Sequence, residues 1–139
     1  MVKIRAFKKS NSKGVIKLWK DCFNYYSSPH YKPEKSLRSK VEHKDGLLFV
    51  AVDGSAVIGS VMAGFDGHRG WIYSMAVTPE YRTKGLGSRL IKHAEKELKK
   101  RGAPKINLQV MPDNKGVVEF YEKNGYAVEA RISMGKRLK

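Results

Sequence analysis

The stretch VTPEYRTKGLGSRL, residues 77–90, joins an apolar segment to a pattern that is typical of a helix. A helix start leaves backbone N–H groups without partners and carries partial positive charge, so it is suited to bind phosphate. Gly85 and Gly87 lack the Cβ atoms that would hold an anion away from these amides. Arg82 and Lys84 add full positive charges beside them. The stretch therefore predicts a pyrophosphate site.

A G-x-G pattern also occurs in simple turns and in two other kinds of phosphate-binding site. The dinucleotide-binding fingerprint needs a third glycine where this chain has Leu90, and it normally follows the first strand of its fold. Asp113, however, stands near the place of a ribose-binding acid, so that interpretation keeps some support. The P-loop pattern G-x-x-x-x-G-K-[ST] does not occur in the chain.

One strand and two helices are expected before this stretch. Residues 2–7 alternate apolar and basic side chains, as a strand with one exposed face does. Residues 10–26 place apolar side chains three or four positions apart after cap-type serines, which predicts a core-facing helix. Cys22 lies on that apolar face, so we interpret it as a small buried group. A second helix is expected from Pro33, after a loop.

Three antiparallel strands are expected from Leu47 to Val77, because the period of the apolar pattern changes to two. The Asp-Gly pair at residues 53–54 supplies the positive φ angles of a tight hairpin turn. A second turn at residues 66–70 leads into the third strand, WIYSMAV.

A patterned helix over residues 87–102 and a strand over 105–110 follow the glycine stretch. A strand, a helix and a second strand in this order form a right-handed crossover, and hence a parallel pair around residues 71–110. The chain is expected to end with a short helix over 113–125 and one or two strands over 126–138. Asp113 or Asn114 would cap that helix.

The chain of 139 residues has the length of one domain, and we expect a single domain over 1–139. Its formal net charge is +15, which suits a nucleic acid, an anionic membrane surface or a phosphate-rich cofactor, although the lysines could equally form an ordinary solvated surface. No apolar stretch of about 18 residues and no signal-peptide pattern is present, so we expect a cytoplasmic protein. One cysteine and four histidines without zinc-ligand spacing predict no metal site.

The glycine stretch resembles the acetyl-CoA motif of the GNAT N-acetyltransferases. The matching positions of V-x-P-x-x-R-x-x-G-x-G-x-x-L are Val77, Pro79, Arg82, Gly85, Gly87 and Leu90. A downstream segment is similar to the second conserved segment of the family, at Asn114, Phe120, Tyr121, Gly125 and Tyr126. The resemblance implies an α/β acyl-CoA acyltransferase fold. Its mixed central sheet has antiparallel N-terminal strands and a parallel pair that splays in a V, and helices flank it.

The resemblance also implies where acetyl-CoA would bind. The pyrophosphate would lie on the amides of Arg82, Thr83, Lys84, Gly85, Leu86, Gly87 and Ser88. The pantetheine arm would pair with Met75, Ala76 and Val77, and Asn114 could touch the same arm. A backbone N–H near Met75 or Ala76 would face the thioester oxygen and stabilise the developing oxyanion.

The implied reaction is direct attack by an amine on the thioester, without an acetylated enzyme. Tyr121 matches the usual acid of the family, although it also belongs to an apolar helical patch and could simply pack there. The strand WIYSMAV has no carboxylate, so a water ordered by Tyr73 is our preferred base. Asp66, His68 and Glu119 are the alternatives, and Asp66 with His68 also fits plain turn chemistry.

The acceptor is a primary amine that the sequence does not identify. Cationic amines would be repelled by a charge of +15, so acidic acceptors fit better, although salt shortens such forces to about 8 Å. Family members are often homodimers. Two alternatives stay open: a nucleic-acid-binding domain that uses the basic surface, and a non-catalytic acyl-CoA sensor.

Overall fold

The computed structural model describes residues 1–23, 32–112 and 114–138. They form two compact units, Met1–Gln109 and Val110–Lys139. Asp113 and the predicted end of the first helix lie outside the described residues. The single domain over 1–139 stays a prediction.

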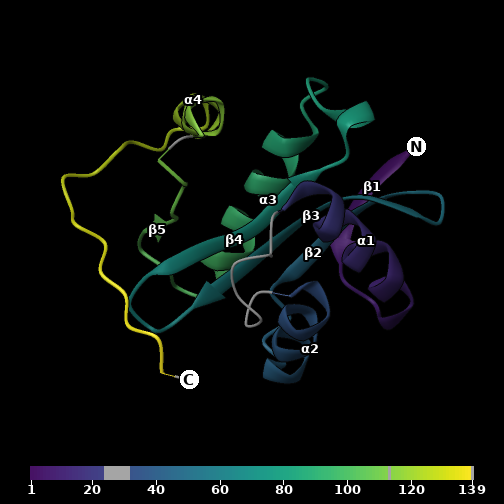
Figure 1. The fold of residues 1–139 in the computed structure, drawn as a ribbon, viewed down its shortest axis with the longest axis horizontal. Helices are drawn as coiled ribbons and strands as arrows, with labels where there is room; N and C mark the ends of the chain where they lie inside the picture. Colours follow the sequence, from purple (N-terminus) through teal and green to yellow (C-terminus); the bar gives the residue numbers. More distant parts are fainter. Residues whose placement is uncertain (24–31, 113, 139) are drawn as a thin grey trace. The chain divides into compact units, whose positions relative to one another are not determined.

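The first unit is built on one five-stranded sheet (Figure 1). The strands lie in chain order and are β1 (Val2–Ala6), β2 (Leu48–Asp53), β3 (Ala56–Phe65), β4 (Gly70–Val77) and β5 (Ile106–Asn107). The first three pairings are antiparallel and the pairing of β4 with β5 is parallel. The predicted mixed sheet is confirmed.

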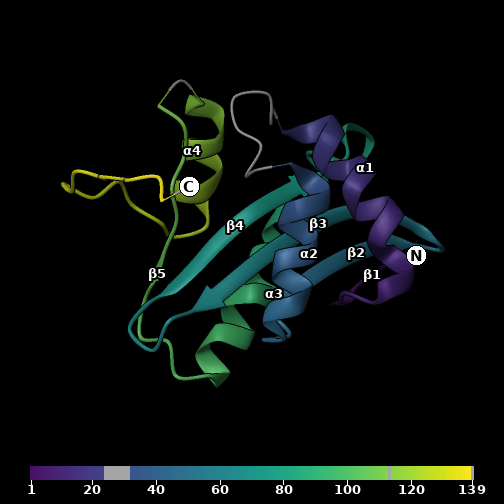
Figure 2. The same ribbon diagram turned by 60° about the horizontal axis from the view of Figure 1, so that its bottom comes forward.

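Helices cover both faces of this sheet. α1 (Ser12–Cys22) and α2 (Pro33–His43) lie on one face and α3 (Leu86–Lys100) lies on the other (Figure 1, Figure 2). The core between the sheet and the first two helices centres on Trp19, which has no exposed surface. α3 buries the five apolar residues that its sequence pattern predicts, Leu86, Leu90, Ile91, Ala94 and Leu98.

α3 packs closely on β3 at a glycine. A Cβ atom on Gly59 would lie 2.9 Å from Leu90 Cδ1 and 3.2 Å from the carbonyl oxygen of Ala76. Glycine therefore allows an approach of helix and sheet that a larger residue would prevent.

β4 contains a β-bulge. Ala76 pairs with Ser60 and Tyr73 pairs with Met62, so two residues of β4, Ser74 and Met75, lie opposite one residue of β3. Ser74 adopts the left-handed region at φ +47°, which is unusual for a residue other than glycine. Such an insertion bends the strand and increases its twist.

The parallel pair β4–β5 is short. Only Gly70 and Trp71 of β4 pair with Ile106 and Asn107, whereas the sequence predicts a strand over 105–110. The pairing ends at Trp71 and Asn107, so β5 is only two residues long. Among the described residues of this unit, no strand pairs with the rest of that edge of β4.

The second unit contains α4 (Lys115–Lys123), as the sequence predicts, and it ends close to Gly125 at φ +93°. The prediction of final strands over 126–138 is wrong, because the described residues of this segment form no strand. Its apolar side chains are exposed, with Val128 at 78% and Ile132 at 91%. Alternation of apolar residues stabilises a strand only when a neighbouring strand accepts its hydrogen bonds.

Among the described residues, none of the helices has the length and apolar character of a membrane span.

Candidate functional site

The loop from β4 to α3 is anchored at its start. The 3₁₀ turn η3 (Pro79–Tyr81) follows β4 directly. Thr78 N–H donates to the carbonyl oxygen of Ile58 on β3 at 2.9 Å. The Tyr81 hydroxyl donates to Asp53 Oδ2 at 2.5 Å, which ties the loop to the β2–β3 turn. The loop therefore leaves the sheet in a fixed direction.

The start of α3 has no side-chain cap. Gly85 occupies the N-cap position at φ +79°, and a Cβ atom there would meet nothing within 4 Å. The N–H groups of Leu86, Gly87 and Ser88 occupy the first helical positions, where no acceptor exists inside the helix. Uncapped amides beside open space have the geometry that helix N-termini use to bind anions.

Thr83 stores strain in this loop. Its φ is +66°, a region that costs a β-branched residue on the order of 1–2 kcal/mol. Strained residues of this kind concentrate at ligand-binding sites.

The two basic side chains of the loop are placed differently. Lys84 lies with its Nζ 5.7 Å from the centre of the Tyr81 ring and is exposed. Arg82 instead folds back, because its Nε donates to the carbonyl oxygen of Val77 at 2.8 Å and its Nη2 lies 3.6 Å from Cys22 Sγ. The Arg82 amide already donates to Pro79 at 3.2 Å. Arg82 therefore fixes the loop on β4, and the available loop amides begin at Thr83.

The pairing of β4 distinguishes its exposed amides from its paired ones. Thr78 bonds to Ile58, and Ala76 lies opposite Ser60 two residues earlier, so the Ala76 N–H also faces β3. Consecutive residues of a strand direct their N–H groups to opposite sides, so Met75 and Val77 direct theirs away from β3. The sequence analysis left two amides, those of Met75 and Ala76, as candidates to stabilise the oxyanion. By this alternation, the Met75 amide is the one on the side of β4 away from β3.

Tyr73 lies on β4 just before the bulge, with half of its surface exposed, and its ring stacks on Trp71 at 6.5 Å. Burial and, to a smaller extent, the charge of Asp66 raise the pKa of the Tyr73 hydroxyl. The hydroxyl therefore stays protonated at neutral pH, so it can orient a water but cannot itself accept a proton.

Asp66 closes the β3–β4 turn. Its Oδ1 accepts hydrogen bonds from the backbone N–H groups of His68 and Arg69, each at 2.8 Å. The bond from Arg69, followed by that from His68, lowers the pKa of Asp66. Of the two interpretations of Asp66, turn chemistry therefore fits the structure better than a general base.

The remaining predicted residues belong to the second unit. Tyr121 is 7% exposed, and burial raises the pKa of its phenol to about 12. Its ring contacts the rings of Phe120 at 5.1 Å and Tyr126 at 5.6 Å, edge to face. Asn114 is the N-cap residue of α4, but its side chain makes no capping hydrogen bond. Glu119 is exposed, as expected for a solvent-facing residue.

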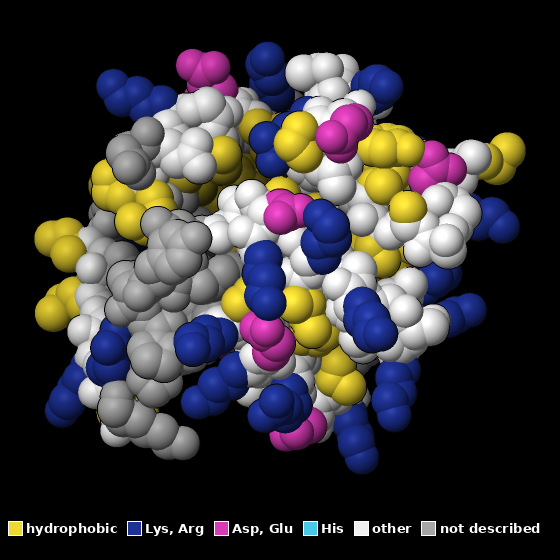
Figure 3. Space-filling model, turned by 45° about the vertical axis from the view of Figure 1, so that its right-hand side comes forward, with side chains coloured by type: hydrophobic (Ala, Val, Ile, Leu, Met, Phe, Trp, Pro, Cys, Tyr) yellow, Lys and Arg dark blue, Asp and Glu magenta, His cyan; other side chains and the backbone are white. Residues whose placement is uncertain are grey.

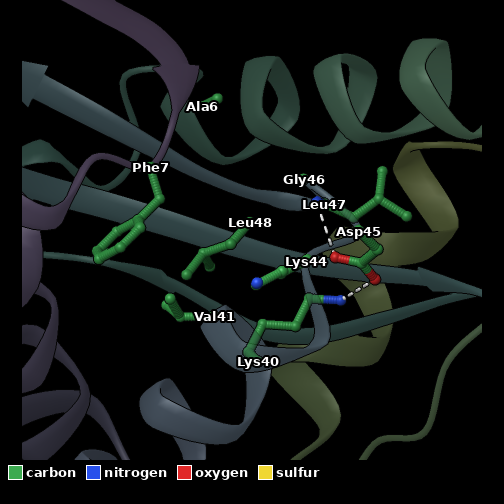
Figure 4. Close-up of a pocket in the computed structure, with 9 residues that line it drawn as sticks. All are labelled: Ala6, Phe7, Lys40, Val41, Lys44, Asp45, Gly46, Leu47 and Leu48. Carbon is green, nitrogen blue, oxygen red and sulfur yellow. Dashed lines mark hydrogen bonds and ion pairs between the residues drawn. The ribbon is translucent and has the colours of Figure 1, made fainter.

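A separate hollow of about 310 Å³ lies beside the first residues of β2 and the end of α2 (Figure 4). Two of its charged groups are paired with protein atoms, since Lys40 Nζ lies 2.7 Å from Asp45 Oδ2 and Asp45 Oδ1 accepts from the Leu47 N–H at 3.0 Å. These contacts stabilise the start of β2, so Lys40 and Asp45 serve the fold of this corner.

Residues 13–126 match the model of the acetyltransferase (GNAT) family. The chain belongs to this family. It is 41% identical over 137 residues to an acetyltransferase of Yersinia enterocolitica and 40% identical to one of Pectobacterium atrosepticum, with 99% of this chain and 96% of each relative covered. The chain is therefore a GNAT acetyltransferase, and the resemblance of its two motifs is confirmed.

Solved structures agree with this GNAT fold. A PaiA N-acetyltransferase of Thermoplasma acidophilum in complex with coenzyme A has a TM-score of 0.80 at 24% identity, covering 95% of this chain and 93% of the other. An aminoglycoside N-acetyltransferase in complex with CoA has a TM-score of 0.81 at 17% identity, covering 100% and 96%.

Some residues that shape the site were missed at the level of sequence. Ser60 is a polar residue within the apolar run of β3, and it has no exposed surface. That single polar position in AVIGSVMAGF, the sequence of β3, was the available signal. Tyr81 and Asp53 lie 28 residues apart, and no local pattern predicts their bond.

Proposed function

We propose that this acetyltransferase moves the acetyl group of acetyl-CoA directly to a primary amine. The amine nitrogen bonds to the acetyl carbon, the carbon–sulfur bond breaks, the amine loses a proton and the departing thiolate gains one. The observation that carries the proposal is the uncapped start of α3 next to the unpaired edge of β4. The first suits a pyrophosphate and the second suits the amides of a pantetheine arm.

Each predicted site residue would have a defined role in binding or catalysis. The amides from Thr83 to Ser88 would hold the pyrophosphate, and the open edge of β4 from Met75 to Val77 would pair with the pantetheine arm. The Met75 N–H would stabilise the oxyanion, a contribution of about 3 kcal/mol for one such donor. Tyr121 would protonate the thiolate, Asn114 would touch the arm, and a water ordered by Tyr73 would accept the proton of the amine.

Calorimetry with acetyl-CoA tests the proposed site. Gly87→Asp places bulk and negative charge among the first amides of α3, so we expect a loss of affinity of about 100-fold, equivalent to one or two charge-assisted hydrogen bonds. The helix itself should keep its stability, because an acidic residue is favourable at a helix start. Gly135→Asp makes the same change at an exposed position with open space and serves as the control. Unchanged affinity of Gly87→Asp would remove the basis of the proposal.

The amine acceptor can be identified by measuring the release of free thiol from acetyl-CoA in the presence of each member of a panel of amines. Proteins of similar fold are named as N-acetyltransferases of aminoglycosides, of glucosamine-6-phosphate and of the alanine of a ribosomal protein. The panel contains these three classes and an acidic peptide. The net charge of +15 favours an anionic acceptor, so glucosamine-6-phosphate or an acidic peptide should react faster than an aminoglycoside. Slow thiol release that no amine accelerates would instead support an acyl-CoA sensor.

A further inference from the structure

Two consecutive hydrogen bonds that begin in the core connect α1 with the bulge of β4. The Trp19 indole N–H donates to Ser60 Oγ at 2.8 Å, and the Ser60 hydroxyl donates to the carbonyl oxygen of Ser74 at 3.0 Å. Trp19 and Ser60 have no exposed surface. These two side chains therefore act on Ser74 in an environment where an unpaired polar group is costly.

The carbonyl group that accepts the second of these hydrogen bonds belongs to the bulge residue itself. Ser74 is the residue at φ +47°, and the register of β3 and β4 slips between Ser60 and Met62. A bulge leaves one residue outside the regular ladder of backbone bonds. The Ser60 hydroxyl supplies a donor for the Ser74 carbonyl oxygen at this interruption, and Trp19 supplies a donor for the Ser60 oxygen.

Met75 follows Ser74 directly, so the orientation of its N–H depends on the same peptide unit that Ser60 holds. The carbonyl carbon of Ser74 and the nitrogen of Met75 belong to one planar peptide group. Fixing the oxygen of that group fixes the direction of the N–H on its other side. Counted back from Ala76, which pairs with Ser60, the alternation of the strand assigns this N–H to the open edge of β4.

We propose that Ser60 and Trp19 are positioning residues, which hold the Ser74–Met75 peptide so that the Met75 N–H faces the thioester oxygen. The proposal rests on the proposed function, because it assigns these residues to its oxyanion donor. Neither side chain touches the reacting atoms. Ser60 acts through the Ser74 carbonyl, and Trp19 orients the Ser60 hydroxyl.

The test compares Ser60→Ala with wild type for turnover with the best amine of the panel and for coenzyme A affinity by calorimetry. Loss of the hydroxyl frees the peptide, so we expect kcat to fall about 10- to 100-fold, within the range for loss of one oxyanion donor. The affinity for coenzyme A should change less than about twofold, because the pyrophosphate amides belong to the separate loop. Trp19→Phe should lower kcat less, since the Ser60 hydroxyl can still donate to Ser74.

Asn11→Ala is the matched control for stability. Asn11 is another buried polar residue of the first unit, and its Oδ1 accepts the Lys8 N–H at 2.9 Å and an Arg5 N–H at 3.0 Å. Its loss should reduce stability as Ser60→Ala does, but it should leave kcat near that of wild type.

The possible outcomes separate the two proposals. If wild type releases no thiol with any amine, the proposed function fails, and the role of Ser60 in its chemistry fails with it. If wild type is active and Ser60→Ala keeps its kcat, the positioning role is wrong while the function stands. If Ser60→Ala loses kcat and coenzyme A affinity together, or Asn11→Ala loses as much kcat, the effect is general destabilisation and the positioning role is also wrong.

Discussion

The Tyr121 phenol is placed so that its packing and its proton can be tested separately. Its ring contacts Phe120 and Tyr126, and phenylalanine would keep both contacts. We therefore expect Tyr121→Phe to leave thermal stability and acetyl-CoA affinity almost unchanged. Turnover should fall about 10²- to 10⁴-fold if the hydroxyl is the acid. Equal losses of affinity and turnover, measured by calorimetry and thiol release, would mean that Tyr121 only packs.

The same residue predicts a pH dependence of stability. Burial raises the pKa of Tyr121 to about 12, above the ordinary value near 10 that it regains on unfolding. The stability gained by keeping the phenol neutral is present below pH 10 and is lost as the pH rises from about 10 to 12. The difference in tyrosinate absorbance between wild type and Tyr121→Phe should titrate near pH 12. A difference that titrates near pH 10 would contradict this assignment.

Asp66 provides a third test at this scale. Asp66→Asn keeps an oxygen that can accept the N–H groups of His68 and Arg69, but it removes the basic carboxylate. If Asp66 only closes the turn, kcat should stay within about twofold of wild type between pH 6 and 9. A loss of 100-fold or more would identify it as the base and would remove Tyr73 from that role.

At the scale of elements, one glycine sets how closely α1 packs on β3. A Cβ atom on Gly14 would lie 2.7 Å from Val57 Cγ2, and valine has little rotamer freedom to avoid it. Gly14→Ala should therefore lower the free energy of unfolding by about 1–3 kcal/mol, despite the better helix propensity of alanine.

Gly116→Ala in α4 is the comparison, because a Cβ atom there meets nothing within 4 Å. This change should stabilise α4 by up to about 1 kcal/mol. Urea denaturation of both variants measures the contrast, and stabilisation by Gly14→Ala would show that α1 can shift away from the sheet.

Elements with strong local signals were predictable, and elements that depend on distant partners were not. α3 has a complete apolar stripe, so its position followed from the sequence alone. β5 is shorter than its pattern predicts, and residues 126–138 form no strand, because a strand also needs a paired neighbour.

The candidate site divides in the same way. Gly85 and the helix start behind it were evident from residue types and spacing. The hydrogen bonds from Arg82 to the Val77 carbonyl oxygen and from Ser60 to the Ser74 carbonyl oxygen depend on tertiary packing. Residue type therefore predicted which chemistry is available, whereas the direction of each donor required the structure.

At the scale of the whole molecule, the main electrostatic feature is the excess of basic over acidic residues. The chain has 28 Lys or Arg residues against 13 Asp or Glu residues. On the face shown in Figure 3, basic side chains spread over the surface and stand beside acidic ones only in places. Exposed ion pairs such as Lys17–Asp21, at 2.9 Å, contribute less than about 1 kcal/mol each. Repulsion among the remaining charges therefore opposes folding at low salt.

The choice of salt should separate the effect of this general repulsion from that of the anion site proposed at the start of α3. Sodium chloride should raise the melting temperature through screening. Sulfate at equal ionic strength should add about 1 kcal/mol of stability when its concentration is about five times its Kd for the start of α3. Gly87→Asp should keep the screening effect and lose most of the extra gain. An equal sulfate effect in both proteins would show that sulfate acts only as a general stabilising salt.

The bulge also constrains how the length of β4 can change. Because of the extra residue, Tyr73 and Ala76 share one face of the sheet although they are three positions apart. Deleting Ser74 would put Tyr73 and Ala76 two positions apart, as in a regular strand, so the side chains before the bulge would keep their faces. A second deletion would have no extra residue to absorb it, and Trp71 would turn toward the layer where Gly70 now lies, where a Cβ atom would lie 3.0 Å from Leu98 Cδ1. Related sequences should thus tolerate the loss of one residue from this strand but not of two.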